Sequence, residues 1–118
     1  MKVLLIDDDA DLLEMNVKRF KRKGYEAEFA QNLSSARNIL KNSTDINSIV
    51  CDLFLLDGEN GVDFFENEVK ATFKGKFVLA TGDDTADPRI EKNKQDNKNF
   101  TCFQKPYSID DVIKFIEQ

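Results

Sequence analysis

Residues 2–8 read Lys-Val-Leu-Leu-Ile-Asp-Asp, and this stretch decides the fold class. The four apolar residues follow one another without alternation, as in a strand that is covered on both faces. Two acids stand where such a strand ends. Strands of this kind belong to parallel sheets, in which the loops at the carboxyl ends of the strands form the ligand site.

Four further short runs extend the same pattern along the chain. Residues 49–51, 77–80 and 101–103 are again apolar with little alternation and predict buried strands. Residues 25–29 instead alternate apolar and charged side chains, which favours a strand at the edge of the sheet. The sequence therefore predicts five strands.

Apolar residues at helical spacing lie between these runs. They are Leu13, Val17 and Phe20; Leu33, Ala36 and Leu40; Val62, Phe65, Val69 and Phe73; and Ile109, Val112, Ile113 and Ile116. Strict alternation of strands and helices predicts an open α/β sheet with helices on both faces. Residues 83–99 contain few apolar side chains, so we expect the fourth helix to be short or irregular, with Asp87-Pro88 at its start.

Length and charge limit the possible functions. The chain has 118 residues, which fits one domain spanning residues 1–118, and its net charge of −5 opposes direct binding to nucleic acid or to anionic membranes. No apolar run approaches the ~20 residues that cross a bilayer. Cys51 and Cys102 lie in apolar stretches without a C-x-x-C motif, which favours a reducing, cytoplasmic location. The chain has no histidine, so its chemistry depends on carboxylates.

Polar residues follow four of the predicted strands: Asp7 and Asp8 the first, Asp52 the third, Thr81 the fourth and Lys105 the fifth. In a parallel sheet these ends meet at one edge. Three neighbouring carboxylates repel one another by about 4 kcal/mol per close pair, so a cation must neutralise them. Oxygen ligands favour Mg²⁺, and the set suits phosphoryl transfer, in which catalysis consists mostly of positioning and neutralising charge.

In this order, Asp7-Asp8, Asp52, Thr81-Gly82 and Lys105-Pro106-Tyr107 resemble the receiver domains of bacterial response regulators, including the single-domain chemotaxis type. The resemblance covers the whole chain. It implies a flavodoxin-like, doubly wound parallel sheet in the order 2-1-3-4-5, and a cis peptide bond before Pro106.

The resemblance also implies a role for each residue of the site. Asp52 would be the phosphoacceptor, with Thr81 and Lys105 binding the phosphoryl group. Mg²⁺ would be held by Asp7, Asp8, Asp52 and the backbone carbonyl of Phe54. The expected partners are a histidine kinase or a histidine phosphotransfer protein and a downstream protein target that the sequence does not identify. Such a domain is a signalling switch and not an enzyme with a separate substrate.

Some positions depart from the family pattern. Leu56 and Asn60 stand where the family usually has Pro and Gly, and Gly61 comes one residue late, so the comparison with the family predicts a loop that is one residue longer. Cys102 replaces an aromatic residue that often couples to the threonine. One alternative function is therefore a degenerate receiver that acts as a constitutive interaction module.

A further alternative is a haloacid-dehalogenase-like phosphohydrolase, because Asp7 and Asp9 form a D-x-D motif after the first strand. Such enzymes use the first Asp as the nucleophile, which leaves Asp52 without a role.

Overall fold

A computed structural model of the chain describes residues 1–56, 58–82 and 87–118. Its five strands form one parallel sheet in the order β2-β1-β3-β4-β5, as predicted. The strands are β1 (Lys2–Ile6), β2 (Glu26–Ala30), β3 (Ser48–Asp52), β4 (Lys76–Thr81) and β5 (Phe100–Gln104). The alternating strand β2 lies at an edge, also as predicted.

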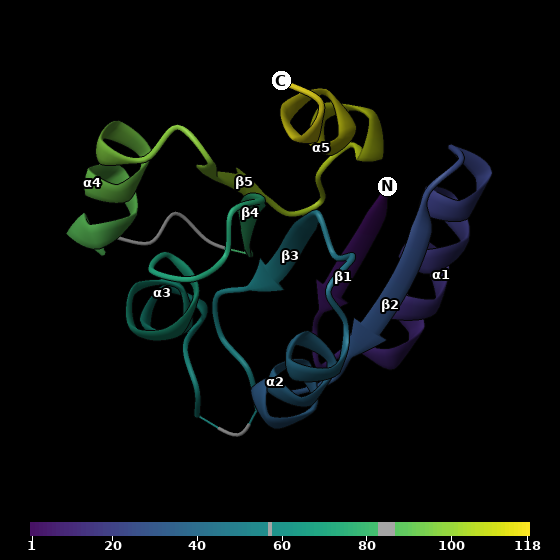
Figure 1. The fold of residues 1–118 in the computed structure, drawn as a ribbon, viewed down its shortest axis with the longest axis horizontal. Coiled ribbons are helices and arrows are strands. Elements are labelled where there is room, and N and C mark those ends of the chain that lie inside the picture. The colour runs from purple at the N-terminus through teal and green to yellow at the C-terminus, as the bar shows by residue number, and fades with distance from the viewer. Residues whose placement is uncertain (57, 83–86) are drawn as a thin grey trace.

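Helices cover both faces of the sheet, with α1 and α5 on one side and α2, α3 and α4 on the other (Figure 1). Their bounds are α1 (Ala10–Arg22), α2 (Leu33–Asn42), α3 (Gly61–Phe64), α4 (Pro88–Asp96) and α5 (Ile109–Ile116). A π-helical turn, η1 (Phe65–Val69), continues α3, and the Lys70 N–H donates to the Phe65 carbonyl at 2.9 Å. The doubly wound architecture is confirmed.

Alternate residues of the buried strands pack into two separate apolar clusters. Leu5 and Val50 join the cluster under α1 and α5, whereas Leu4 and Ile49 join the cluster under α2, α3 and α4. This division explains the unbroken apolar runs, because both faces of β1 and β3 are covered.

Polar side chains define where the helices begin. Asp9 accepts a hydrogen bond from the Leu12 N–H at the start of α1, and Ser108 accepts one from the Asp111 N–H at the start of α5. Asp87 and Pro88 start α4, as expected. The predicted weak segment at residues 83–99 therefore contains a regular nine-residue helix, while residues 83–86 lie outside the described part.

Cys51 is buried and Cys102 is half-buried, and neither forms a disulfide. Within the described residues, no helix combines the length and apolar character needed to cross a membrane.

Candidate functional site

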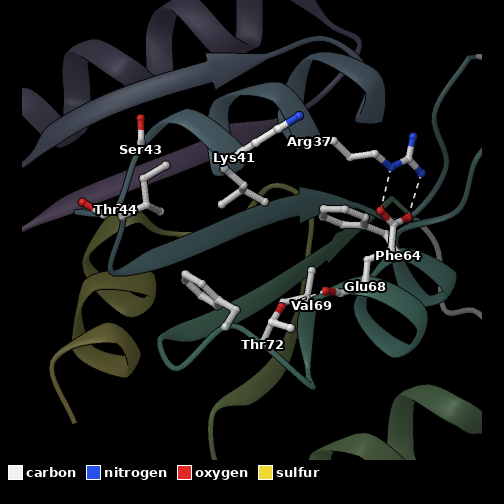
Figure 2. Close-up of a pocket in the computed structure, with 11 residues that line it drawn as sticks. Arg37, Lys41, Ser43, Thr44, Phe64, Glu68, Val69 and Thr72 are labelled. Atoms are coloured by element: carbon white, nitrogen blue, oxygen red, sulfur yellow. Dashed lines mark hydrogen bonds and ion pairs between the residues drawn. The ribbon is translucent and has the colours of Figure 1, made fainter.

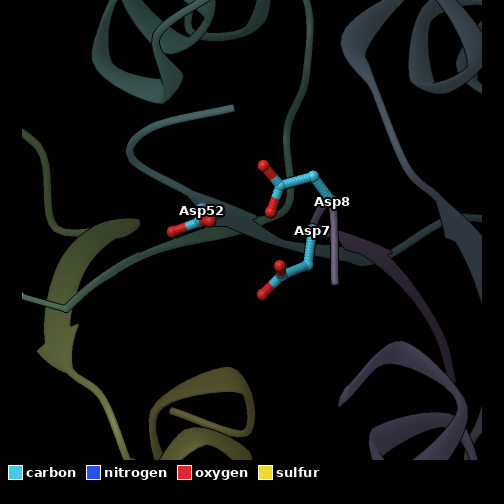
Figure 3. A group of neighbouring side chains, drawn as sticks. All are labelled: Asp7, Asp8 and Asp52. Carbon is cyan, nitrogen blue, oxygen red and sulfur yellow. The ribbon is translucent and has the colours of Figure 1, made fainter. Parts of the chain in front are cut away.

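Three carboxylates meet at the carboxyl ends of the central strands. Asp7 and Asp8 follow β1, Asp52 ends β3, and one carboxylate oxygen from each lies within 4.8 Å of the other two. Figure 3 shows the three side chains converging from the ends of these strands. The parallel register brings them together, because Ile6 is paired with Cys51 across β1 and β3. The predicted acidic cluster is therefore present.

Lys105 contributes a positive charge from the fifth strand's end. Its Nζ lies 2.7 Å from Asp7 Oδ2 and 3.3 Å from Asp52 Oδ1. Its backbone N–H donates to the Thr81 carbonyl at 2.7 Å, and the peptide bond to Pro106 is cis, as the resemblance implied. Burial alone would lower the pKa of Lys105, but the hydrogen bond to Asp7 and the charge of Asp52 raise it. The lysine therefore stays protonated.

Asp52 is the carboxylate that the site perturbs most clearly. Burial raises the pKa of Asp52 to about 6, the positive charge of Lys105 opposes this rise, and the nearby Asp7 adds to it. The side chain retains 13% of its exposure. At neutral pH the group is therefore mainly an anion that is crowded by other anions and still reachable from solvent.

Thr81 and Phe54 lie at the ends of the neighbouring segments. Thr81 is the last residue of β4 and is buried, and Ala80 before it is paired with Asp52. Phe54 follows β3 and forms an antiparallel bridge with Asn60. Leu53 accepts from Gly61, and Leu55 donates to Glu59, so the N–H and carbonyl of Phe54 between them point away from that partner strand.

Gly61 lies one residue later than the glycine of the family pattern, but close contacts still require a glycine there. A Cβ atom at Gly61 would lie 2.5 Å from the Asp52 carbonyl oxygen and 2.8 Å from Leu79 Cδ1. Only glycine permits so close an approach of α3 to the end of β3. The late glycine noted in the sequence therefore has a steric cause.

Asn16 and Tyr107 form a partly buried polar contact beneath the site that sequence reasoning missed. Asn16 is 5% exposed, and its Nδ2 lies 3.3 Å from the Tyr107 hydroxyl oxygen. Burial is the main reason that the pKa of Tyr107 rises to about 12. The available signal was a polar residue within the apolar stripe of the first helix, between Leu13 and Phe20.

The donor set fits a small hard cation. Asp7, Asp8 and Asp52 offer only oxygen atoms, and a divalent ion would offset the repulsion that Lys105 offsets only in part. Asp9 does not belong to this set, because its side chain caps α1. The D-x-D motif is therefore divided between a site residue and a helix cap, which weighs against the phosphohydrolase alternative.

Comparison with known proteins agrees with this geometry. The response regulator receiver domain model matches residues 3–117. No curated protein matches the chain in sequence.

Solved structures share the fold. The receiver domain of the Francisella response regulator 1452 has a TM-score of 0.79 and 22% identity, covering 98% of this chain and 93% of that one. A CheY-like receiver domain protein from Methanospirillum hungatei JF-1 has a TM-score of 0.82 and 22% identity, with coverages of 98% and 90%.

A response regulator from Burkholderia pseudomallei, solved with a phosphorylated aspartic acid, a calcium ion and citrate, has a TM-score of 0.80 and 18% identity. Here the coverages are 98% of this chain and 65% of that one. With a family match over nearly its whole length and the same fold, the chain belongs to the response regulator receiver domain family.

Proposed function

We propose that the chain is a phosphoryl-accepting switch of a two-component system, with Asp52 as the acceptor. The observation that carries the proposal is the position of the Asp52 carboxylate, which lies within 4.8 Å of Asp7 and Asp8 oxygens and 3.3 Å from Lys105 Nζ. One nucleophilic carboxylate thus stands between a potential cation site and a fixed ammonium group. This is the arrangement that phosphoryl transfer to a carboxylate requires.

In the proposed reaction, an Asp52 oxygen attacks the phosphorus atom of a phosphohistidine on a histidine kinase or a histidine phosphotransfer protein. An O–P bond forms as the N–P bond breaks, and the electron pair of that bond remains on the imidazole nitrogen, which takes up a proton. Because the pKa of Asp52 is about 6, the group is mainly deprotonated at neutral pH. The phosphoaspartate then alters the surface that a downstream protein target recognises.

Each neighbouring residue has a proposed role in this step. Asp7, Asp8, Asp52 and the carbonyl of Phe54 would hold Mg²⁺, which neutralises charge on the transferred phosphoryl oxygens. The Lys105 ammonium group moves away from the Asp52 carboxylate and pairs with a further phosphoryl oxygen. The Thr81 hydroxyl, at the end of β4, donates a hydrogen bond to the phosphoryl group.

The test is phosphorylation by acetyl phosphate with Mg²⁺, followed by intact-mass measurement. Wild-type protein should gain one phosphoryl group, and Asp52→Asn should gain none. Asp7→Asn should slow the reaction by about 100-fold, because it removes a cation ligand. An unmodified wild-type protein would instead favour the constitutive interaction module, and turnover of phosphate that depended on Asp7 and not on Asp52 would favour a phosphohydrolase.

A further inference from the structure

The loop after Asp52 closes on itself as a small hairpin, defined here as residues 53–61, of which residue 57 lies outside the described part. The Gly61 N–H donates to the Leu53 carbonyl at 2.8 Å, and the Leu55 N–H donates to the Glu59 carbonyl at 3.2 Å. Residues 59–61 therefore form one arm of the hairpin, and residues 53–55, which include Phe54, form the other. The position of one arm determines the position of the other.

Apolar packing holds this hairpin at few points. Among the described residues of the hairpin, the buried side chains are Leu53 and Leu55, both on the arm that carries Phe54. Phe54 is 63% exposed and Leu56 is 89% exposed. The arm at residues 59–61 buries no apolar side chain, so its location depends on polar contacts.

Arg37 on α2 supplies such a contact. Its Nη2 lies 2.7 Å from Glu59 Oε2 in the hairpin, and its Nε lies 2.7 Å from Glu68 Oε1 in η1. Figure 2 shows the paired contact with Glu68, in which two guanidinium nitrogens face the two carboxylate oxygens. The hydrogen bonds from Arg37 also hold the pKa of Glu68 below its ordinary value. One guanidinium group thus joins α2, the hairpin and η1.

The geometry of arginine suits this double contact. A planar guanidinium presents donors in fixed directions, so it can bind two carboxylates at once, whereas an ammonium group cannot reproduce the same fork. The Arg37 guanidinium carbon also lies 5.9 Å from the centre of the Phe64 ring, which restricts its position further. The contact is therefore directional.

We propose that Arg37 is a positioning residue for the cation site and that it acts through Glu59. The ion pair fixes the arm at residues 59–61, and its hydrogen bonds to the other arm act together with the buried Leu53 and Leu55 to orient Phe54. The Phe54 carbonyl is thereby held in place before the cation arrives. This inference rests on the proposed function, in which that carbonyl is a Mg²⁺ ligand. Because both partners are partly exposed, this ion pair adds little to the free energy of unfolding of the whole protein. Its effect is therefore confined to the position of the hairpin.

The chain offers a matched pair of variants for the test. Glu59→Gln and Glu68→Gln each remove one carboxylate from Arg37, but only Glu59 belongs to the hairpin. Mg²⁺ affinity is measured by calorimetry at pH 7.5, amide hydrogen exchange of Leu55 and Gly61 is measured in metal-free protein, and global stability is measured by urea unfolding.

We expect Glu59→Gln to raise the Mg²⁺ dissociation constant by about two- to fivefold and to speed exchange at both amides by a similar factor. Glu68→Gln should change the dissociation constant and the exchange rates by less than about twofold. The two variants should have similar urea midpoints. Arg37→Met should change the Mg²⁺ dissociation constant and the exchange rates as much as Glu59→Gln does. The double variant Arg37→Met with Glu59→Gln should bind Mg²⁺ no more weakly than Arg37→Met alone.

Equal Mg²⁺ affinity in wild type and Glu59→Gln would overturn the inference, and so would an equal loss in Glu68→Gln. Additive losses in the double variant would show that Arg37 does not act through Glu59. If wild-type protein bound no Mg²⁺, the proposed function would fail together with the positioning role toward the cation. The exchange rates would then still decide whether Arg37 holds the hairpin.

Discussion

Helices α4 and α5 are similar in length but are attached to the sheet in opposite ways. Helix α5 buries Ile109, Val112 and Ile116 in the apolar cluster that it shares with α1. Helix α4 buries one apolar side chain, Ile90, together with the polar Asn93. On opposite faces of the sheet, α5 therefore makes an apolar contact and α4 a largely polar one (Figure 1).

The polar contact of α4 is made of directed pairs. Arg89 forms an ion pair with Asp63 in α3, and Asn93 Nδ2 donates to Glu66 Oε2 in η1 at 2.9 Å. The ion pair of Arg89 with the N-cap residue Asp87 and the hydrogen bond from Asn93 Nδ2 to the Arg89 carbonyl at 2.8 Å lie within the helix and its cap. Apolar contacts are insensitive to direction, whereas hydrogen bonds and ion pairs are lost after small shifts. We therefore expect α4 to open locally at lower free energy than α5.

The largest expected effect comes from truncating the apolar contact. Ile116→Ala should lower the free energy of unfolding by about 3 kcal/mol, because it leaves a cavity between α5 and α1. The matched variant Ile90→Ala on α4 should cost about 2 kcal/mol, since a loosely held helix can shift into the space. Urea unfolding measures both, and a larger loss in Ile90→Ala would contradict the comparison.

The second expected effect concerns the charge of Asp52, which ends β3 between the two helix layers. We expect a change of this charge to affect the stability of the structure on both faces of the sheet. The pKa of Asp52 is raised from 3.8 to about 6, so the folded state holds this proton more tightly than the unfolded chain does. Protonated Asp52 therefore stabilises the folded state below about pH 4, and this contribution to the free energy of unfolding is lost as the pH rises through 6.

In metal-free protein, we expect wild type to lose about 2 kcal/mol between pH 4 and pH 7 relative to Asp52→Asn. The measurement is urea unfolding of both proteins in chelator across this range. Parallel pH profiles of the two proteins would show that the crowded carboxylate does not strain the fold.

A smaller effect is expected from the buried amide on α4. Asn93→Ala removes two hydrogen bonds and should lower the free energy of opening of α4 by about 1 kcal/mol, without changing α5. Amide hydrogen exchange of both helices is the measurement, with the exposed Lys92→Ala as the control. Faster exchange throughout the molecule would mean that α4 does not open as a separate unit.

The smallest expected effect is that of salt. At 1 M NaCl the screening length falls to about 3 Å, so the half-exposed pairs of Arg89 should weaken and the opening free energy of α4 should fall by about 0.5 kcal/mol. Arg89→Met should remove this salt dependence. Equal salt sensitivity in α4 and α5 would contradict the assignment of a polar attachment to α4 alone.

Several features of the fold could be predicted from local pattern. The unbroken apolar runs identified the strands, and the first strand, Lys2–Ile6, ends directly before the acidic pair, as expected. The alternation at residues 25–29 identified an edge strand. Both patterns reflect burial of single strands, which depends on the sequence of each strand and little on its partners.

Prediction was weaker for α4 and for the loop after Asp52. The small number of apolar residues in 83–99 predicted a short or irregular helix; α4 has nine residues and is regular, and the ion pair of Arg89 with Asp63 supplements its single buried apolar side chain. The shifted glycine suggested an altered loop, yet Gly61 still meets the Asp52 carbonyl. Arg89 and Asp63 are 26 residues apart, and Gly61 meets the Asp52 carbonyl only because α3 packs against the end of β3, so no local pattern reveals either contact.

By itself, the sequence determined the fold class, the strand order by resemblance, and the meeting of Asp7, Asp8 and Asp52 at one sheet edge, because parallel strands present their carboxyl ends together. The tertiary structure alone decided how Lys105 divides its charge between Asp7 and Asp52, and that Arg37 joins Glu59 to Glu68. These contacts depend on side-chain directions across packed elements, and distances of a few tenths of an ångström govern them.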